Sequence, residues 1–306
     1  MQASNRLRSI FRVKGLRKAE LNFILITIIP AVIFYAVLRY YPLATSFYMS
    51  LHDWQLMRDH QFFIGLKNYF TILSDRTFLR AIQNTVLFAF TTSIITTILG
   101  LLVAITMNPI RRGGSVVRLI YFLPNITAGV GIFVVWRWLY HPQIGFFNQI
   151  LRLIGEQRIN FLGSPQWALK SIIIMAVWGA VGYYAIILVA ALRNIPAMYY
   201  EAAIVDGGNG FQIARYITIP LISPVLTFVF ITSLIGSFNV FMPVYILTRG
   251  GPLDSTQVIA YQIYVYAFQR LWMGMASAMA FVLFVMVMTL TVVQLRLRKS
   301  DEESLA

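Results

Sequence analysis

The stretch EAAIVDGGNGFQIARYITIP, residues 201–220, lies between two long apolar runs and is too polar and too rich in glycine to continue either of them. Pro196 precedes it and suits a helix start, because proline lacks only an N–H group that is unpaired there anyway. The run from Asp206 to Gly210 contains three glycines and predicts the end of that helix. This pattern predicts two short helices joined by a glycine hinge.

The second helix of the hinge has its own start and stop signals. Asn209 can cap its N-terminus and Gln212 can reach back to complete a capping box, while Pro220 is expected to limit the helix. The first helix exposes Glu201 beside Ala202 and Ala203, whose small side chains let another backbone approach closely. We therefore expect the segment to fit a socket on another protein. The simpler alternative is an amphipathic loop that only joins two membrane spans.

The composition places the chain among polytopic membrane proteins. Of its 306 residues, 58% are hydrophobic and 12% are charged, which leaves more apolar surface than a soluble domain can bury. The formal charge of +14 resides in connectors between apolar runs, so retention of basic loops in the cytoplasm explains it better than nucleic-acid binding, which we exclude. With no cysteine, neither disulfides nor thiolate metal sites are available.

Apolar runs of about 20 residues predict membrane helices. The predicted fold is all-α, with six spans at residues 21–38, 81–107, 119–135, 168–192, 222–247 and 273–293. We divide the chain into a basic tail (1–20), a first span with an external cap (21–79), a five-helix core with the hinged loop at 196–220 (80–295), and a cytoplasmic C-terminal tail (296–306), of which residues 301–306 are expected to be disordered.

Two spans carry unusual residues. Pro124, Asn125, Gly129 and Gly131 are expected to loosen the third span, as is tolerated where a helix faces protein or a cavity. The second span carries a thread of hydroxyl residues suited to hydrogen bonds between helices. These are Thr91, Thr92, Ser93, Thr96 and Thr97.

The basic N-terminal tail predicts the orientation of the chain, because positive charges before the first span favour the cytoplasmic side. An even number of spans then places both termini and the 196–220 loop in the cytoplasm.

The sequence lacks the common motifs for nucleotide binding, metal-dependent hydrolysis and ion coupling. It contains no GxxxxGK[ST] phosphate-binding loop, no HExxH and no paired carboxylate within a span. We therefore expect no catalytic residue, no metal ligand and no bound cofactor, and any ATP and Mg²⁺ to be used by a partner.

The 201–220 segment resembles the cytoplasmic loop of the membrane subunits of binding-protein-dependent ABC importers. EAA, three residues, a glycine, nine residues and I-x-(apolar)-P all fall in register, with Ile219 where leucine is usual. The resemblance implies that the loop is a coupling helix docking into the ATPase subunit. The residues it implicates are Glu201, Ala202, Ala203, Asp206, Gly207, Ile217 and Pro220.

The resemblance extends from about residue 65 onward and points to the sugar-importing branch, specifically to subunits related to the larger maltose permease subunit and the glycerol-3-phosphate permease. The segments that carry it include GLKNYFTIL, YFLPNITAG, LRNIPAMYYEAA and YILTRGGPLDST. The chain is shorter than the maltose subunit, lacking its extra N-terminal spans and large external domain, so maltose as substrate does not follow.

The same resemblance implies solute contacts on both sides of the loop. The positions that match are Gly179, Ala180, Tyr183, Ser233, Gly236, Ser237 and Val240. Gly236 and Ser237 replace a phenylalanine and an asparagine of the family, and Val240 replaces another asparagine, so we expect a roomier pocket. Tyr184 and Asn239 are added because sugars are bound by aromatic faces with neutral donors and acceptors.

The resemblance also implies partners: a second homologous permease, an ATPase dimer, an external solute-binding protein and a sugar, in the lipid bilayer of a prokaryotic cell membrane. ATPase closure would move the loop as a lever and open a central site alternately to each side. The alternatives are an importer of glycerol phosphates or another polar solute, a secondary carrier driven by an ion gradient, and a membrane enzyme.

Overall fold

The computed structural model describes residues 18–58, 60–109, 113–127 and 129–304. Within these ranges the chain is almost entirely helical, which confirms the predicted all-α class. The described strands form one short antiparallel ladder that pairs His52 with Phe63 and Asp53 with Phe62. Residues 1–17 of the predicted basic tail and residues 305–306 of the C-terminal tail lie outside the described ranges.

The elements are as follows, with η marking π-helical turns. The first half contains α2 (Lys18–Tyr35), η1 (Ala36–Tyr40), α3 (Tyr41–Ser50), β1 (His52–Asp53), β2 (Phe62–Phe63), α4 (Lys67–Ser74), α5 (Arg76–Met107), α6 (Gly114–Ile126) and α7 (Gly129–Leu139). The second half contains α8 (Phe146–Leu153), α9 (Ala168–Arg193), α10 (Ala197–Val205), α11 (Gly210–Ile213), η2 (Ala214–Thr218), α12 (Ile219–Phe238), α13 (Met242–Leu247), α14 (Ile259–Tyr264), η3 (Val265–Gln269) and α15 (Met273–Ser304).

Among the described residues, five helical segments are long and apolar enough to cross a bilayer, and the bent pair α6–α7 makes a sixth if it counts as one crossing. The predicted spans at 81–107, 168–192 and 273–293 correspond to α5, α9 and α15. Helix α5 begins five residues early because Asp75 caps it, accepting a hydrogen bond from the Thr77 N–H at 2.9 Å.

The C-terminal tail corrects a prediction. We expected residues 301–306 to be disordered, whereas α15 continues to Ser304. No glycine or proline occurs between Met275 and Ser304, so nothing in the sequence breaks the helix.

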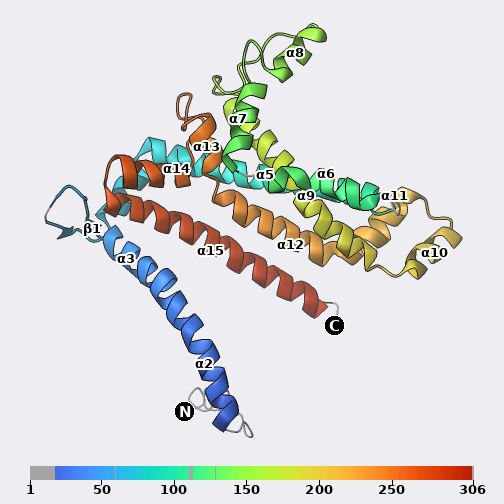
Figure 1. Ribbon diagram of the computed structural model, residues 1–306, viewed down its shortest axis with the longest axis horizontal. Coiled ribbons are helices and arrows are strands. Elements are labelled where there is room, and N and C mark those ends of the chain that lie inside the picture. Colours follow the sequence, from blue (N-terminus) through green and yellow to red (C-terminus); the bar gives the residue numbers. More distant parts are fainter. Residues whose placement is uncertain (1–17, 59, 110–112, 128, 305–306) are drawn as a thin grey trace.

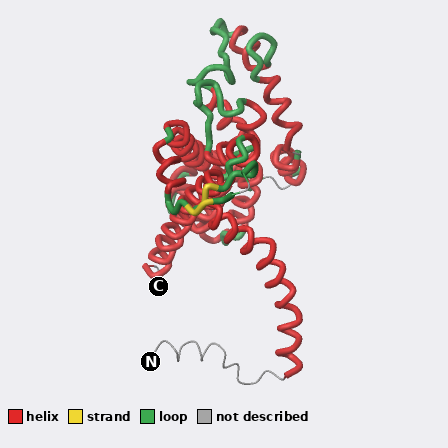
Figure 2. Tube along the Cα trace, turned by 90° about the vertical axis from the view of Figure 1, so that its left-hand side faces the viewer, coloured by secondary structure: helices red, strands yellow, loops and turns green. Residues whose placement is uncertain are grey.

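The first span is longer than predicted. It runs without a break from Asn22 to Ser50 instead of ending near residue 38. A proline normally disrupts a helix, but the turn η1 precedes Pro42 and lets the Tyr41 N–H bond to the carbonyl of Ala36, five residues back. The helix stands away from the bundle, and its residues from 22 to 44 are all exposed (Figures 1 and 2).

The third span, predicted as one helix over residues 119–135, is two helices. The axes of α6 and α7 meet at 93°, with α6 lying along α9 while α7 turns away from it (Figure 1). Helix α6 ends because Thr127 adopts an extended conformation and its hydroxyl donates to the Leu123 carbonyl at 2.8 Å. Gly129 then starts α7 with a positive φ of 31°.

The fifth span also differs from its predicted range of 222–247. A continuous helix of 29 residues runs from Gly210 to Phe238, and α13 is a separate short helix. Pro220 therefore does not end the helix that starts after Asn209. The turn η2 precedes Pro220 as η1 precedes Pro42, and the Ile219 N–H bonds to the Ala214 carbonyl, five residues back.

Helix α5 forms the centre of the bundle and packs along both α9 and α12. Helix α15 packs against α3, α4 and α14, on the side of α12 that faces away from α9. Between α6 and α9 the backbones approach closely at Gly182, where an added Cβ would overlap the carbonyl of Tyr121. Small residues at membrane-helix contacts allow such an approach.

We predict that Gly182→Val separates α6 from α9, because the new side chain cannot fit beside the Tyr121 carbonyl. Overpacking of this kind destabilises a protein by about 1–3 kcal/mol. The measurement is thermal unfolding of the purified chain in detergent. Gly179→Ala is the matched control, since an added Cβ three residues earlier on α9 meets no atom within 4 Å. Equal melting temperatures for the two variants would contradict the prediction.

Candidate functional site

The predicted hinge after α10 is built by backbone hydrogen bonds. The Gly208 N–H bonds to the Ala203 carbonyl at 2.8 Å and the Gly207 N–H bonds to the Ile204 carbonyl at 3.0 Å, the two bonds of a Schellman motif. Gly207 has a φ of 77°, a left-handed conformation that side chains with a Cβ rarely adopt. The glycine therefore sets the direction in which the chain leaves α10.

The predicted capping box after the hinge is confirmed. The Asn209 side chain accepts a hydrogen bond from the Gln212 N–H, and the Gln212 side chain accepts one from the Asn209 N–H, both at 2.9 Å. Two N–H groups at the start of the long helix Gly210–Phe238 are thereby satisfied.

The loop exposes a large apolar surface. No residue of α10 is buried. Val205 and Phe211, on the two sides of the hinge, are 86% and 74% exposed. The loop lies at one end of the molecule, at the opposite end from β1 (Figure 1). An exposed apolar patch at a helical end is typical of a protein-docking surface.

The sequence-predicted loop residues fall into two groups. Glu201, Ala202 and Pro220 are exposed on the outside of the loop. The other four line a hollow of about 310 Å³ between α10 and the start of the next helix, and they are Ala203, Asp206, Gly207 and Ile217. Tyr200 ties the two sides together through its hydroxyl, 3.4 Å from that of Thr218.

A second site lies between the spans. A cavity of about 380 Å³ is enclosed by α5, α9, the end of α12 and the segment leading into α13. Seven of the sequence-predicted solute contacts line it: Ala180, Tyr184, Ser233, Gly236, Ser237, Asn239 and Val240. We call this space the central cavity.

The structure does not bring Gly179 and Tyr183 to the central cavity. On α9 the lining residues are Ala176, Ala180 and Tyr184, which repeat every four residues along one helix face. Tyr183 points elsewhere, is 42% exposed, and stacks on Phe122 of α6 with ring centroids 6.4 Å apart. Gly179 and Tyr183 therefore lie on a different face of α9 from Ala180 and Tyr184, and this difference is decided by the helix and not by the resemblance.

The cavity also has lining residues that the sequence analysis did not assign to it. They are Phe88, Thr92, Ala176, Phe241, Met242 and Pro243. Thr92 belongs to the hydroxyl thread of α5, for which we predicted hydrogen bonds between helices. That prediction is wrong for four of the five residues, because the buried hydroxyls of Thr92, Ser93, Thr96 and Thr97 have no hydrogen-bond partner among the described residues. The spacing of the threonines was the one available signal that this face of α5 is polar.

The chemistry of the central cavity is neutral and mixed. None of its lining residues carries a charge. Hydroxyl groups come from Thr92, Tyr184, Ser233 and Ser237. Asn239 donates its Nδ2 to the Ile235 carbonyl at 3.0 Å, so its Oδ1 remains available as an acceptor. Aromatic faces beside uncharged donors and acceptors suit a polar, uncharged solute.

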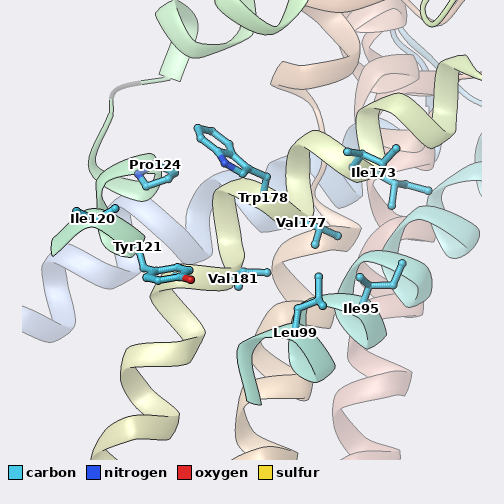
Figure 3. Close-up of a pocket in the computed structure, with 11 residues that line it drawn as sticks. Ile95, Leu99, Ile120, Tyr121, Pro124, Ile173, Val177, Trp178 and Val181 are labelled. Atoms are coloured by element: carbon cyan, nitrogen blue, oxygen red, sulfur yellow. The ribbon is translucent and has the colours of Figure 1, made fainter. Parts of the chain in front are cut away.

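A larger hollow between α5, α6 and α9 has a different character. It measures about 530 Å³, and Figure 3 shows Ile95, Leu99 and Val181 among its mostly aliphatic walls. Tyr121 and Trp178 contribute the few polar atoms. Such a lining suits acyl chains or a neighbouring apolar helix, so the central cavity is the better candidate for a polar solute.

No cluster of three or more His, Cys, Asp or Glu side chains that could hold a metal ion occurs in the part of the chain that the structure describes. The described site therefore consists of the exposed loop and the central cavity.

Comparisons with known proteins point to one family. The family described as "Binding-protein-dependent transport system inner membrane component" matches residues 96–300. The trehalose/maltose transport system permease protein MalF of Thermococcus litoralis is 34% identical over 250 residues, which cover 82% of this chain and 84% of the relative. The lactose transport system permease protein LacF of Rhizobium radiobacter is 34% identical over 245 residues, covering 78% and 81%.

Among solved structures, the crystal structure of a bacterial ABC transporter that imports the acidic polysaccharide alginate is similar in fold. It superposes with a TM-score of 0.78 at 24% identity and covers 91% of this chain and 97% of that chain.

We predict that the central cavity admits water. The natural chain has no cysteine, so a single Ser237→Cys variant reports only its own site. Its thiol should react with a water-soluble maleimide at least about tenfold faster than that of Ser171→Cys, because thiol reactivity follows exposure. Ser171 is fully buried and its hydroxyl is bonded within the core. The measurement is the labelling rate in membranes, and equal rates would contradict an open cavity.

Proposed function

Because the chain belongs to the family of binding-protein-dependent transport system inner membrane components, we propose that it forms half of the translocation path of an ATP-driven importer and carries a saccharide through the central cavity. An external solute-binding protein delivers the saccharide. The chain is a multi-pass membrane protein, and in the proposed orientation both termini and the hinged loop face the cytoplasm of a prokaryotic cell.

One observation carries the mechanism. The helix Gly210–Phe238 starts inside the exposed loop and ends at the central cavity, where Ser233 and Ser237 line the wall. At 1.5 Å per residue its 29 residues span about 43 Å. Helix α9 also connects the exposed loop with the central cavity, and it forms the opposite wall of that cavity. A push on the loop therefore moves two cavity walls as rigid bodies, which is the motion that alternating access requires.

The proposed driving force is a partner ATPase dimer that receives the loop. Glu201 is exposed beside the small Ala202, and no side chain of α10 is buried in this chain. We propose that α10 enters a cleft of the ATPase and that Glu201 pairs with a basic residue there. ATP and Mg²⁺ then act in the partner.

The proposed second partner is a homologous permease that completes the path. The first span supports it, since residues 22–44 are exposed and stand apart from the bundle (Figure 2). The central cavity is open on one side in the single chain, so a second chain is needed to enclose the solute.

The saccharide assignment rests on the neutral lining of the central cavity and on relatives named for trehalose, maltose and lactose transport. A glycerol phosphate importer is the alternative within transport. No lysine or arginine lines the central cavity to balance a phosphate charge, so the geometry favours the saccharide. Competition in uptake assays between maltose and a glycerol phosphodiester distinguishes the two.

We predict that Gly207→Val abolishes ATP-driven uptake while the protein stays in the membrane. A β-branched residue at a φ of 77° costs about 1–3 kcal/mol of strain, which redirects α10 away from its partner. The measurement is uptake of radiolabelled maltose or trehalose into proteoliposomes that contain the assembled importer. Gly210→Ala is the control, because Gly210 lacks a positive φ and its Cβ meets no atom within 4 Å. Normal uptake by the valine variant would rule out the lever.

We predict that Gly236→Phe narrows the solute range. The added ring projects into the central cavity, since a Cβ there meets no atom within 4 Å. Uptake of a trisaccharide should fall about tenfold more than uptake of a monosaccharide, because a filled pocket rejects the larger solute first. Gly179→Phe, on α9 but outside the cavity, should preserve the ratio of the two rates. If Gly179→Phe changed the ratio of the two uptake rates more than Gly236→Phe does, the solute path would lie on the other face of α9.

A further inference from the structure

A second polar cavity lies in the cap that joins the first span to α5. It measures about 360 Å³ and is formed by the β1–β2 hairpin, α4 and the start of α15. Its lining residues are Asp53, Trp54, Gln55, Arg58, Ile64, Lys67, Asn68, Thr71, Trp272 and Met275. It shares none of them with the central cavity and lies at the opposite end of the molecule from the exposed loop at residues 196–220 (Figure 1). We call it the cap cavity.

The walls of the cap cavity are held in place by buried hydrogen bonds. Asn68 is 5% exposed, and its Nδ2 donates to the carbonyls of Ser50 and His52, both at 2.9 Å. The hairpin is tied to α15 because the Gly274 N–H bonds to the Trp54 carbonyl at 3.0 Å. Gly274 is required at this contact, since a Cβ would overlap the His52 carbonyl. A preformed cavity loses little free energy in ordering its walls when a ligand binds.

The polar groups of the cap cavity form a connected set. The Asp53 carboxylate accepts from Gln55 Nε2 at 3.0 Å and from Arg58 Nη1 at 3.1 Å. Each carboxylate oxygen retains a free lone pair, and both recorded bonds of Asn68 use its Nδ2, which leaves Oδ1 as an acceptor. Lys67 adds a donor on α4, while Thr71, whose hydroxyl donates to the Lys67 carbonyl at 2.9 Å, adds an acceptor.

The apolar part of the lining is aromatic. Trp54 directly follows β1 and Trp272 directly precedes α15, and both line the cavity. A pyranose ring presents C–H groups on its faces and hydroxyls around its edge, so it packs on an indole while its edge bonds to carboxylate, amide and guanidinium groups. An acyl chain would offer no hydrogen-bond partner to the Asp53, Arg58 and Lys67 side chains that line the cavity, and the hollow shape does not match a flat protein contact.

We propose that the cap cavity binds a saccharide on the outer side of the membrane, at a site separate from the central cavity. In the proposed orientation it takes sugar from the external medium or from the solute-binding protein. Its lining alone leads to this assignment, which therefore does not depend on the solute of the central cavity.

The test is isothermal titration of the assembled importer in nanodiscs with maltotriose and with trigalacturonate. A Gly236→Phe background disfavours trisaccharides in the central cavity, so the remaining binding that responds to substitution of Trp54 reports the cap. We expect one site per chain for at least one of the two sugars. Trp54→Ala should weaken it by about tenfold, because it removes the packing face, whereas Trp54→Tyr should keep it within about threefold. Trp138→Ala, an exposed tryptophan of α7 outside both cavities, should leave the isotherm unchanged.

Two outcomes overturn the proposal. One is that neither sugar binds in the Gly236→Phe background; the other is that Trp54→Ala and Trp54→Tyr bind as well as the parent. Failure of the proposed transport function is distinguishable from both, because the assembly without Gly236→Phe would then show no ATP-driven uptake while the cap site still titrates.

Discussion

The hydrogen bond from the Ile219 N–H to the Ala214 carbonyl is the interaction on which the proposed mechanism depends. Pro220 lacks an N–H and would normally end or kink the helix at this point. The widened turn η2 absorbs the proline, so the chain from Gly210 to Phe238 remains one helix. Without that continuity, the exposed loop and the central cavity would be two separate features joined by a flexible link.

The same device appears at Pro42, where η1 lets the first span continue to Ser50. In a bilayer every unpaired backbone group is costly, so a helix that contains proline must satisfy the freed carbonyl by other means. The third span solves the problem differently. There the helix ends two residues after Pro124. The helices before and after the break pack on different neighbours: α6 packs on α9, while α7 packs on α13.

The surfaces left exposed show where the chain needs partners. No residue of α10 is buried, and residues 22–44 of the first span are all exposed. Lipid can cover a membrane span, but it cannot cover α10, which lies beyond the ends of α9 and α12. The cap cavity and the central cavity share no lining residue, and the cap cavity lies at the opposite end of the molecule from the exposed loop (Figure 1).

Much of this protein followed from the sequence alone. Long apolar runs predicted the all-α class and most of the spans, because a membrane helix needs about 20 apolar residues whatever its neighbours. The glycine hinge at Gly207 and the capping box at Asn209 were also predicted, since both depend on residues within one turn of each other. Tertiary structure decided the rest. It determined which face of α9 lines the cavity, so that Tyr184 and not Tyr183 points inward. It also kept the helix through Pro220 intact and brought Trp54 beside Trp272 from distant parts of the chain. These outcomes depend on packing between helices, which no local pattern of residues encodes.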